Sequence, residues 1–148
     1  MLIETIDLPE LTTIGIMVEA KWEDLSRAVP AAWEQLFAAE TGATSFLEVS
    51  IGREAGVYRE LVGYLAAKAS EVPPGMVSYS IPPGRYLRII HDGPLDAIPD
   101  QYALLYSHAA AHGLNATDFK LDFGYSPGLP TGRHELHVAI ASDQNRLT

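Results

Sequence analysis

The chain has 148 residues, 47% of them hydrophobic and 20% charged, which is enough apolar material to bury the core of one domain. It contains no cysteine, so disulfides, thiolate metal sites and a cysteine nucleophile are excluded. The formal net charge of −9 and the scattered Lys and Arg residues argue against a direct nucleic-acid partner, which needs a basic face. Because the sequence has neither an apolar run of membrane-spanning length nor an evident signal peptide, it predicts a cytoplasmic protein without a membrane segment.

The first half of the chain is predicted to form a strand, a helix and two further strands. Residues 11–19 are rich in β-branched side chains, as strands are. A proline suits the first turn of a helix, so the helix is expected to begin at Pro30 and to stop before Gly42. The expected elements are a strand over 11–19, a turn with capping residues over 22–28, a helix over 30–40, and strands over 45–51 and 57–66.

After a linker over 67–75, the second half repeats this order. Its expected elements are a strand over 85–91, a helix over 98–112, and strands over 119–125 and 135–141. Offsets of 69, 74 and 75 residues bring Trp33 onto Tyr102, Glu48 onto Asp122 and Leu61 onto Leu136, respectively. Such self-similarity indicates an internal duplication. The sequence therefore predicts one α+β domain, a duplicated strand–helix–strand–strand unit with pseudo-twofold symmetry and a central cleft, with repeats at about 1–72 and 73–148.

Two carboxylates in the middle of predicted strands are the main candidates for a binding site. Glu48 and Asp122 alternate with apolar neighbours, so each is expected on the face opposite the apolar set of its own strand. If that face is plain surface, both residues only aid solubility. If it lines the cleft, the two anions suit a flat organic cation, which gains charge pairing and cation–π contacts. The other expected ligand-binding residues are Tyr64, His137, Trp33 and Tyr102.

The sequence assigns no metal, cofactor or catalytic residue. His108 and His112 are four residues apart on the second predicted helix, a spacing that also occurs in zinc sites. A zinc ion needs further ligands, and the local sequence SHAAAH lacks the glutamate of an HExxH motif. Positive histidines near a helix C-terminus also stabilise the helix dipole. No GxSxG turn or phosphate-binding glycine loop is present.

The second half resembles the GyrI-like small-molecule-binding domain, the effector-binding domain of AraC-type and multidrug-responsive regulators. The residues that carry the resemblance are Ile81, Pro82, Tyr86, His91, Gly93, Pro94, Ile98, Tyr102, Leu105 and Tyr106, followed by the last strand ELHVAI. The resemblance implies the same duplicated fold and a pocket for lipophilic, often cationic, compounds. It also implies a carboxylate on the penultimate strand. Asp122 in KLDFGY matches that position, although the family has glutamate there and a tyrosine where this chain has Gly124.

The resemblance favours a binding module over an enzyme, acting in drug or toxin sensing or sequestration. Many relatives carry a helix-turn-helix domain ahead of this module, whereas this chain is expected to begin with the module itself and to work alone, with a partner protein or as a homodimer. Two alternatives remain open. One is a hydrolase acting on a bound electrophile, since some relatives hydrolyse cyclopropane-bearing toxins. The other is a protein-interaction module of the gyrase-inhibitor type.

Overall fold

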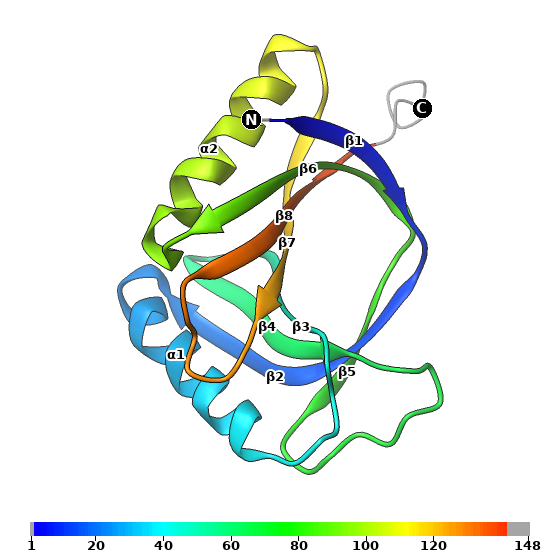
Figure 1. Cartoon of the computed structure of the whole chain (residues 1–148), viewed down its shortest axis with the longest axis vertical. Helices are drawn as coiled ribbons and strands as arrows, with labels where there is room; N and C mark the ends of the chain where they lie inside the picture. The colour runs from blue at the N-terminus through cyan, green and yellow to red at the C-terminus, as the bar shows by residue number, and fades with distance from the viewer. Residues whose placement is uncertain (1, 142–148) are drawn as a thin grey trace.

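The computed structural model describes residues 2–141, and the ends of the predicted repeats at residues 1 and 142–148 lie outside this range. Within it, eight strands form a single antiparallel sheet that two helices cover on one face (Figure 1). The elements are β1 (Ile3–Leu8), β2 (Leu11–Lys21), α1 (Trp22–Ala38), β3 (Phe46–Glu54), β4 (Val57–Leu65), β5 (Val77–Ile81), β6 (Gly84–Gly93), the short 3₁₀ helix η1 (Leu95–Ala97), α2 (Ile98–Ala111), β7 (Ala116–Tyr125) and β8 (Gly132–Ile140).

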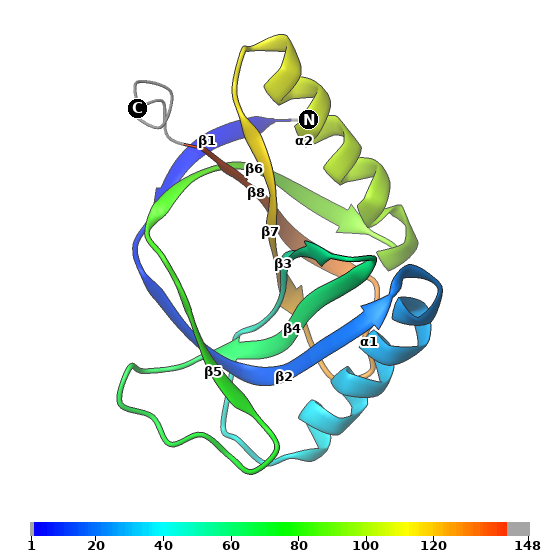
Figure 2. The ribbon, with the colours of Figure 1, turned by 180° about the vertical axis from the view of Figure 1, so that it is seen from behind.

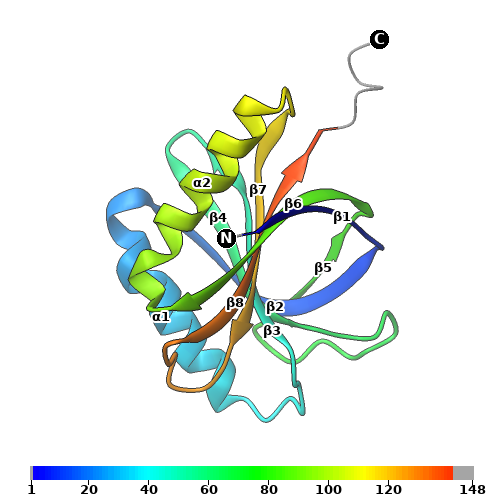
Figure 3. The same cartoon turned by 45° about the horizontal axis from the view of Figure 1, so that its top comes forward.

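The predicted duplication is visible in the order of the strands, β1-β6-β8-β7-β3-β4-β2-β5. Reading outwards from the central pair β3–β7, one side continues with β4 and β2, and the other with their counterparts β8 and β6. Each unit is therefore a strand, a helix and two strands, as the sequence predicts. The two helices lie on the same face of the sheet and diverge from neighbouring N-terminal ends (Figures 1 and 3).

Two strands that the sequence analysis did not separate, β1 and β5, exchange between the units. The strand β1 pairs with β6, and β5 pairs with β2. A single register runs through both pairings, from Ile3 opposite Ile89 to Gly15 opposite Val77. The segments β1–β2 and β5–β6 thus form one long, bent antiparallel ribbon that joins the two halves, which Figure 2 shows from behind.

The prediction of a turn over 22–28 is wrong, because α1 already begins at Trp22. Pro30 therefore lies inside the helix instead of at its start. The segment has no side-chain cap at its N-terminus, but Glu23 and Asp24 in the first turn favour the positive end of the helix dipole. Starting about two turns earlier brings the N-terminal end of α1 near that of α2 (Figure 1).

The predicted offsets between the repeats also need correction in two places. The helices end at Ala38 and Ala111, an offset of 73 instead of 69, so when the helices are aligned at their C-terminal ends Trp33 falls level with Tyr106 and not with Tyr102. A slip of four residues is about one helical turn, which preserves the apolar stripe and hides the error. In the last strands, Val62 lies opposite Glu48 as Leu136 lies opposite Asp122, so the offset is 74 instead of 75.

The core has three parts, and both faces of the sheet are buried. Beneath α1, Trp33 and Leu36 pack on Ile14 and Val62. Beneath α2, Leu105 packs among strand residues that include Leu136. The opposite face of the sheet holds the third cluster, whose buried members are Leu47, Val49, Leu61, Ile81, Tyr86 and Leu121. The face that carries Glu48 and Asp122 is therefore the helix-covered face, and it is free of core packing only between the two helices.

A cleft between the two helices

A cleft of about 990 Å³ lies between α1 and α2, above the central strands β3, β4 and β7. The helices form its walls and the sheet forms its floor. The lining residues are Trp22, Leu25, Ser26, Val29, Pro30, Glu48, Ser50, Gly52, Arg53, Tyr58, Glu60, Leu95, Asp96, Ile98, Pro99, Tyr102, Ala103, Tyr106, Asp118, Lys120, Asp122 and Tyr125. This volume falls at the upper end of the range typical of small-molecule sites.

Three carboxylates meet on the floor. Glu48 on β3 is directly opposite Asp122 on β7, and Glu60 on β4 is directly opposite Ser50, two residues further along β3. Alternation of side chains along a strand keeps Glu48 and Ser50 on one face, so all three acids face the cleft. The acids of the lining outnumber its two bases, Arg53 and Lys120.

Asp122 is buried, with 4% of its surface exposed, and both of its oxygens are hydrogen-bonded. The hydroxyl of Tyr125 donates to Oδ2 at 2.6 Å, and Nδ1 of the fully buried His134 lies 2.7 Å from Oδ1. An ionised carboxylate can only accept, so the hydrogen of this second bond belongs to the imidazole. Satisfied in this way, the Asp122 side chain is fixed in one orientation.

Tyr125 reaches the cleft because β7 carries a bulge at Gly124. Phe46 pairs with Tyr125 and Leu47 with Phe123, which leaves Gly124 as the extra residue. Its φ of 122° and the 2.3 Å that would separate a Cβ atom from the Arg133 carbonyl oxygen both require glycine. Strict alternation along β7 would place Tyr125 on the face of Leu121 and Phe123, and the bulge turns it over to the side of Asp122.

Glu48 lacks the partners that Asp122 has. Within the described residues, no hydrogen bond of ordinary geometry reaches its carboxylate. Its pKa is raised to about 8, chiefly by burial and in part by the neighbouring acids Asp122 and Glu60, while the nearby Tyr125 hydroxyl and Trp33 indole act in the opposite direction. The Trp33 indole nitrogen is itself buried and has no hydrogen-bond partner among residues 2–141. Glu48 is therefore the carboxylate of the floor that is most available to a ligand.

Glu60 has a single hydrogen-bond partner among the described residues. The Ser50 hydroxyl lies 3.0 and 2.9 Å from its two oxygens. Burial raises the pKa of Glu60 to about 7, and the Ser50 bond and the charge of Lys120 moderate the rise. The Lys120 ammonium donates to the Asp118 carbonyl oxygen at 3.0 Å and lies 5.8 Å from the centre of the Tyr106 ring.

The walls are apolar and aromatic, and two of their tyrosines are anchored by their hydroxyls. Tyr102 donates to the Leu121 carbonyl oxygen at 3.1 Å, and Tyr106 donates to that of Thr117 at 2.6 Å. At the rim, the Trp22 side chain is 71% exposed and lies 5.6 Å from the ring of Tyr58. A lipophilic ligand would therefore contact ring surfaces on more than one side.

Of the six residues expected in the site, Glu48, Asp122 and Tyr102 line this cleft. Trp33 lies behind it, stacked on Tyr125 with ring centres 4.6 Å apart. Tyr64 instead lines a separate groove formed with residues 40–41 and 70–74. Tyr64 and His137 were both expected in the central cleft. Neither is among the residues that line it.

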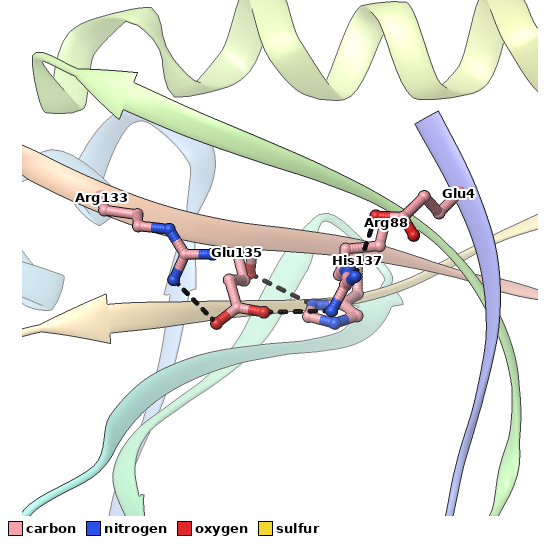
Figure 4. A network of polar contacts seen from close by, with 5 residues as sticks. All are labelled: Glu4, Arg88, Arg133, Glu135 and His137. Carbon is pink, nitrogen blue, oxygen red and sulfur yellow. Dashed lines mark hydrogen bonds and ion pairs between the residues drawn. The ribbon is translucent and has the colours of Figure 1, made fainter. Parts of the chain in front are cut away.

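His137 points to the opposite face of the sheet. It lies opposite Leu121, one residue out of phase with Asp122, and its ring contacts Tyr86 and Phe123. Burial lowers its pKa to about 4. Figure 4 shows this residue beside an ion-pair network on β1, β6 and β8 in which Arg88 bridges Glu4 at 2.9 Å and Glu135 at 3.3 Å. The misplacement follows from the offset of 75, because a shift of one residue turns a strand over.

The sequence analysis missed Glu60 and Tyr125 as site residues. Glu60 carried a usable signal, since strand alternation places it on the same face as Tyr64 and on the strand next to Glu48. Tyr125 carried none, because the bulge that redirects it depends on its pairing with β3.

No group of three or more potential ligands that could hold a metal ion is present among the described residues. The His108 and His112 rings stack on each other with centres 4.0 Å apart, and His112 Nδ1 lies 2.8 Å from the His108 carbonyl oxygen. Over residues 2–141, neither helix combines the length and the apolar character needed to cross a bilayer.

The family described as Cass2, integron-associated effector-binding protein, matches residues 4–140. The chain belongs to this family. The matched range includes every residue that lines the cleft. Membership in the Cass2 family confirms the predicted relationship to effector-binding domains of the GyrI-like kind. No curated protein matches the chain.

Solved structures share the fold at low sequence identity. SAV2435, solved bound to tetraphenylphosphonium, has a TM-score of 0.72 at 10% identity, over 98% of this chain and 97% of its own. The C-terminal domain of EcmrR has a TM-score of 0.68 at 14% identity, over 95% and 98%. An integron cassette protein from the mobile metagenome of Vibrio cholerae has a TM-score of 0.66 at 12% identity, over 94% and 95%.

Proposed function

We propose that this Cass2-family chain binds lipophilic organic cations in the cleft between α1 and α2. The observation that carries the proposal is the floor of the cleft, where Glu48, Glu60 and Asp122 face a space walled by apolar and aromatic side chains. Carboxylates beneath aromatic rings match a ligand whose positive charge is carried on a lipophilic framework.

The charge of the floor favours a cation over a neutral ligand. Raised pKa values for Glu48 and Glu60 mean that each ionised carboxylate lacks full compensation inside the protein. A bound cation would supply that compensation without needing the protein to rearrange. Further support comes from the shared fold of SAV2435, whose structure holds tetraphenylphosphonium, a cation of this kind.

The walls account for the lipophilic part of the preference. Apolar side chains from α1 and α2, together with Tyr102 and Tyr106, would remove the body of the ligand from water. A cation–π contact is worth about 0.5–1 kcal/mol when exposed and about 2 kcal/mol or more when desolvated. Enclosure between the helices would therefore add to the effect of charge.

The test is a calorimetric titration at pH 8.5 with tetraphenylphosphonium and with the neutral triphenylphosphine oxide. We expect wild type to bind the cation, Glu48→Gln to bind it about tenfold more weakly, a loss of about 1.4 kcal/mol, and both proteins to bind the neutral compound alike. The matched control is Glu34→Gln, which removes the same charge from an exposed position of α1 outside the lining. Equal binding of cation and neutral compound by wild type would overturn the proposal.

A further inference from the structure

The two ends of the cleft are not equivalent, although the pseudo-twofold relation would make them so. At one end Tyr125 and Trp33 stack with ring centres 4.6 Å apart, and Phe46 lies edge-on to Trp33 at 6.4 Å. These rings fill that end with protein. At the other end the residue level with Trp33 is Tyr106, and the space stays open above Ser50 and Glu60.

The open end contains a carboxylate that the closed end lacks. By the offset of 74 residues, Glu60 corresponds to His134, which is fully buried and bonded to Asp122. Glu60 instead lines the cleft, with Ser50 as its hydrogen-bond partner and no ion pair among the described residues. Its oxygens therefore keep lone pairs free for a ligand.

Glu48 and Glu60 stand at a fixed separation on the floor. Glu48 is opposite Val62 and Ser50 is opposite Glu60, so the two acids are diagonal neighbours across β3 and β4. Diagonal neighbours of an antiparallel pair are about 7–8 Å apart. With the two residues at diagonal positions, two positive centres on one ligand can each face a carboxylate without sharing it.

We infer that the cleft selects ligands with two positive centres on one lipophilic body, one placed against Glu48 and the other against Glu60. The inference rests on the proposed function and specifies its ligand class. The Lys120 ammonium lies near the second position, but the Asp118 carbonyl and the Tyr106 ring hold it. Its charge opposes the second centre, so it limits the gain without occupying the site.

The test compares two permanently charged ligands of the same shape. One is 1,4-bis(trimethylammoniomethyl)benzene, a dication. The other is its monocation, in which one trimethylammonium group is replaced by the isosteric tert-butyl group. Dissociation constants are measured at pH 8.5 by NMR titration for wild type, Glu60→Gln, Lys120→Met and the control Glu34→Gln. Tetraphenylphosphonium binding is measured on the same samples.

We expect wild type and Glu34→Gln to prefer the dication about tenfold, well beyond the statistical advantage of two equivalent groups. Glu60→Gln should lose this preference, because it weakens binding of the dication more than binding of the monocation, and Lys120→Met should increase it. An equal preference in wild type and Glu60→Gln would overturn the inference. So would a wild type that binds tetraphenylphosphonium but shows no preference, whereas failure to bind tetraphenylphosphonium would count against the proposed function itself.

Discussion

Glu48 and Asp122 lie directly opposite each other on β3 and β7, yet hydrogen bonds hold only the second. Asp122 accepts from Tyr125 and His134, whereas Glu48 lies near the Trp33 indole N–H, which has no hydrogen-bond partner in the described part of the chain. Two facing carboxylates repel when both are ionised. The pair therefore has one carboxylate held by hydrogen bonds and one, Glu48, whose raised pKa of about 8 keeps it protonated until the pH rises or a cation arrives.

This difference predicts how Glu48 affects stability. Its folded pKa of about 8 is above the ordinary value of 4.5, so its contribution is fully present below pH 4.5 and is lost as the pH rises through about 8. We expect Glu48→Gln to unfold at a higher temperature than wild type at pH 9, by on the order of 4–8 °C. At pH 4, below the ordinary value of 4.5, the two proteins should unfold within about 1 °C of each other.

Thermal unfolding followed by circular dichroism at both pH values checks this prediction. Glu34→Gln serves as the control, because its carboxylate is exposed and the substitution should shift the curves little at either pH. A lower unfolding temperature for Glu48→Gln at pH 9 would show that the ionised side chain is stabilised by the fold.

Cation binding should depend on pH in the opposite direction. A cation favours the ionised forms of Glu48 and Glu60, whose pKa values are about 8 and about 7 without ligand. We expect the affinity for tetraphenylphosphonium to rise between pH 6 and 8 by up to about tenfold per unit for each group that ionises on binding, and to level off above about pH 8.5. Calorimetry in buffers of different ionisation enthalpy should detect proton release at pH 7. A flat profile in wild type would contradict the prediction.

The Tyr125 hydroxyl should matter for stability through Asp122. Tyr125→Phe keeps the stack on Trp33 but removes the 2.6 Å hydrogen bond to a buried carboxylate. We expect a loss of about 1–3 kcal/mol in the free energy of unfolding, measured in urea at pH 7. Tyr64→Phe is the matched control, since the Tyr64 hydroxyl has no hydrogen bond among the described residues, and its effect should be below about 1 kcal/mol.

Two glycines facing each other allow β2 and β4 to approach closely. Gly15 is opposite Gly63, and a Cβ atom on Gly63 would lie 2.5 Å from the Ile14 carbonyl oxygen. Because the atoms that an added methyl group would meet belong to the backbone, which cannot move aside as a side chain can, Gly63→Ala should destabilise the protein by about 2–4 kcal/mol. Gly132→Ala, where the added methyl group meets no atom within 4 Å, should change stability by less than about 1 kcal/mol. Urea unfolding of both variants compares them, and equal effects would contradict the packing argument.

The family, the α+β fold class and the general function of small-molecule binding could be predicted from the sequence. They depend on the order of elements and on local residue patterns. The placement of Glu48 and Asp122 on one face also followed from alternation alone. The repeat boundaries near residue 72, the hydrolase and the gyrase-inhibitor alternative stay predictions.

By itself, then, the sequence determined what is local: which segments extend, where the second helix lies, and which side of its own strand each acid takes. The tertiary structure decided whatever depends on pairing between distant segments. The Gly124 bulge that turns Tyr125 towards Asp122 exists only against β3, and the exchange of β1 and β5 exists only between the halves. The face of His137 was mispredicted for the same reason, since one residue of register, set by the partner strand, reverses the face of every side chain.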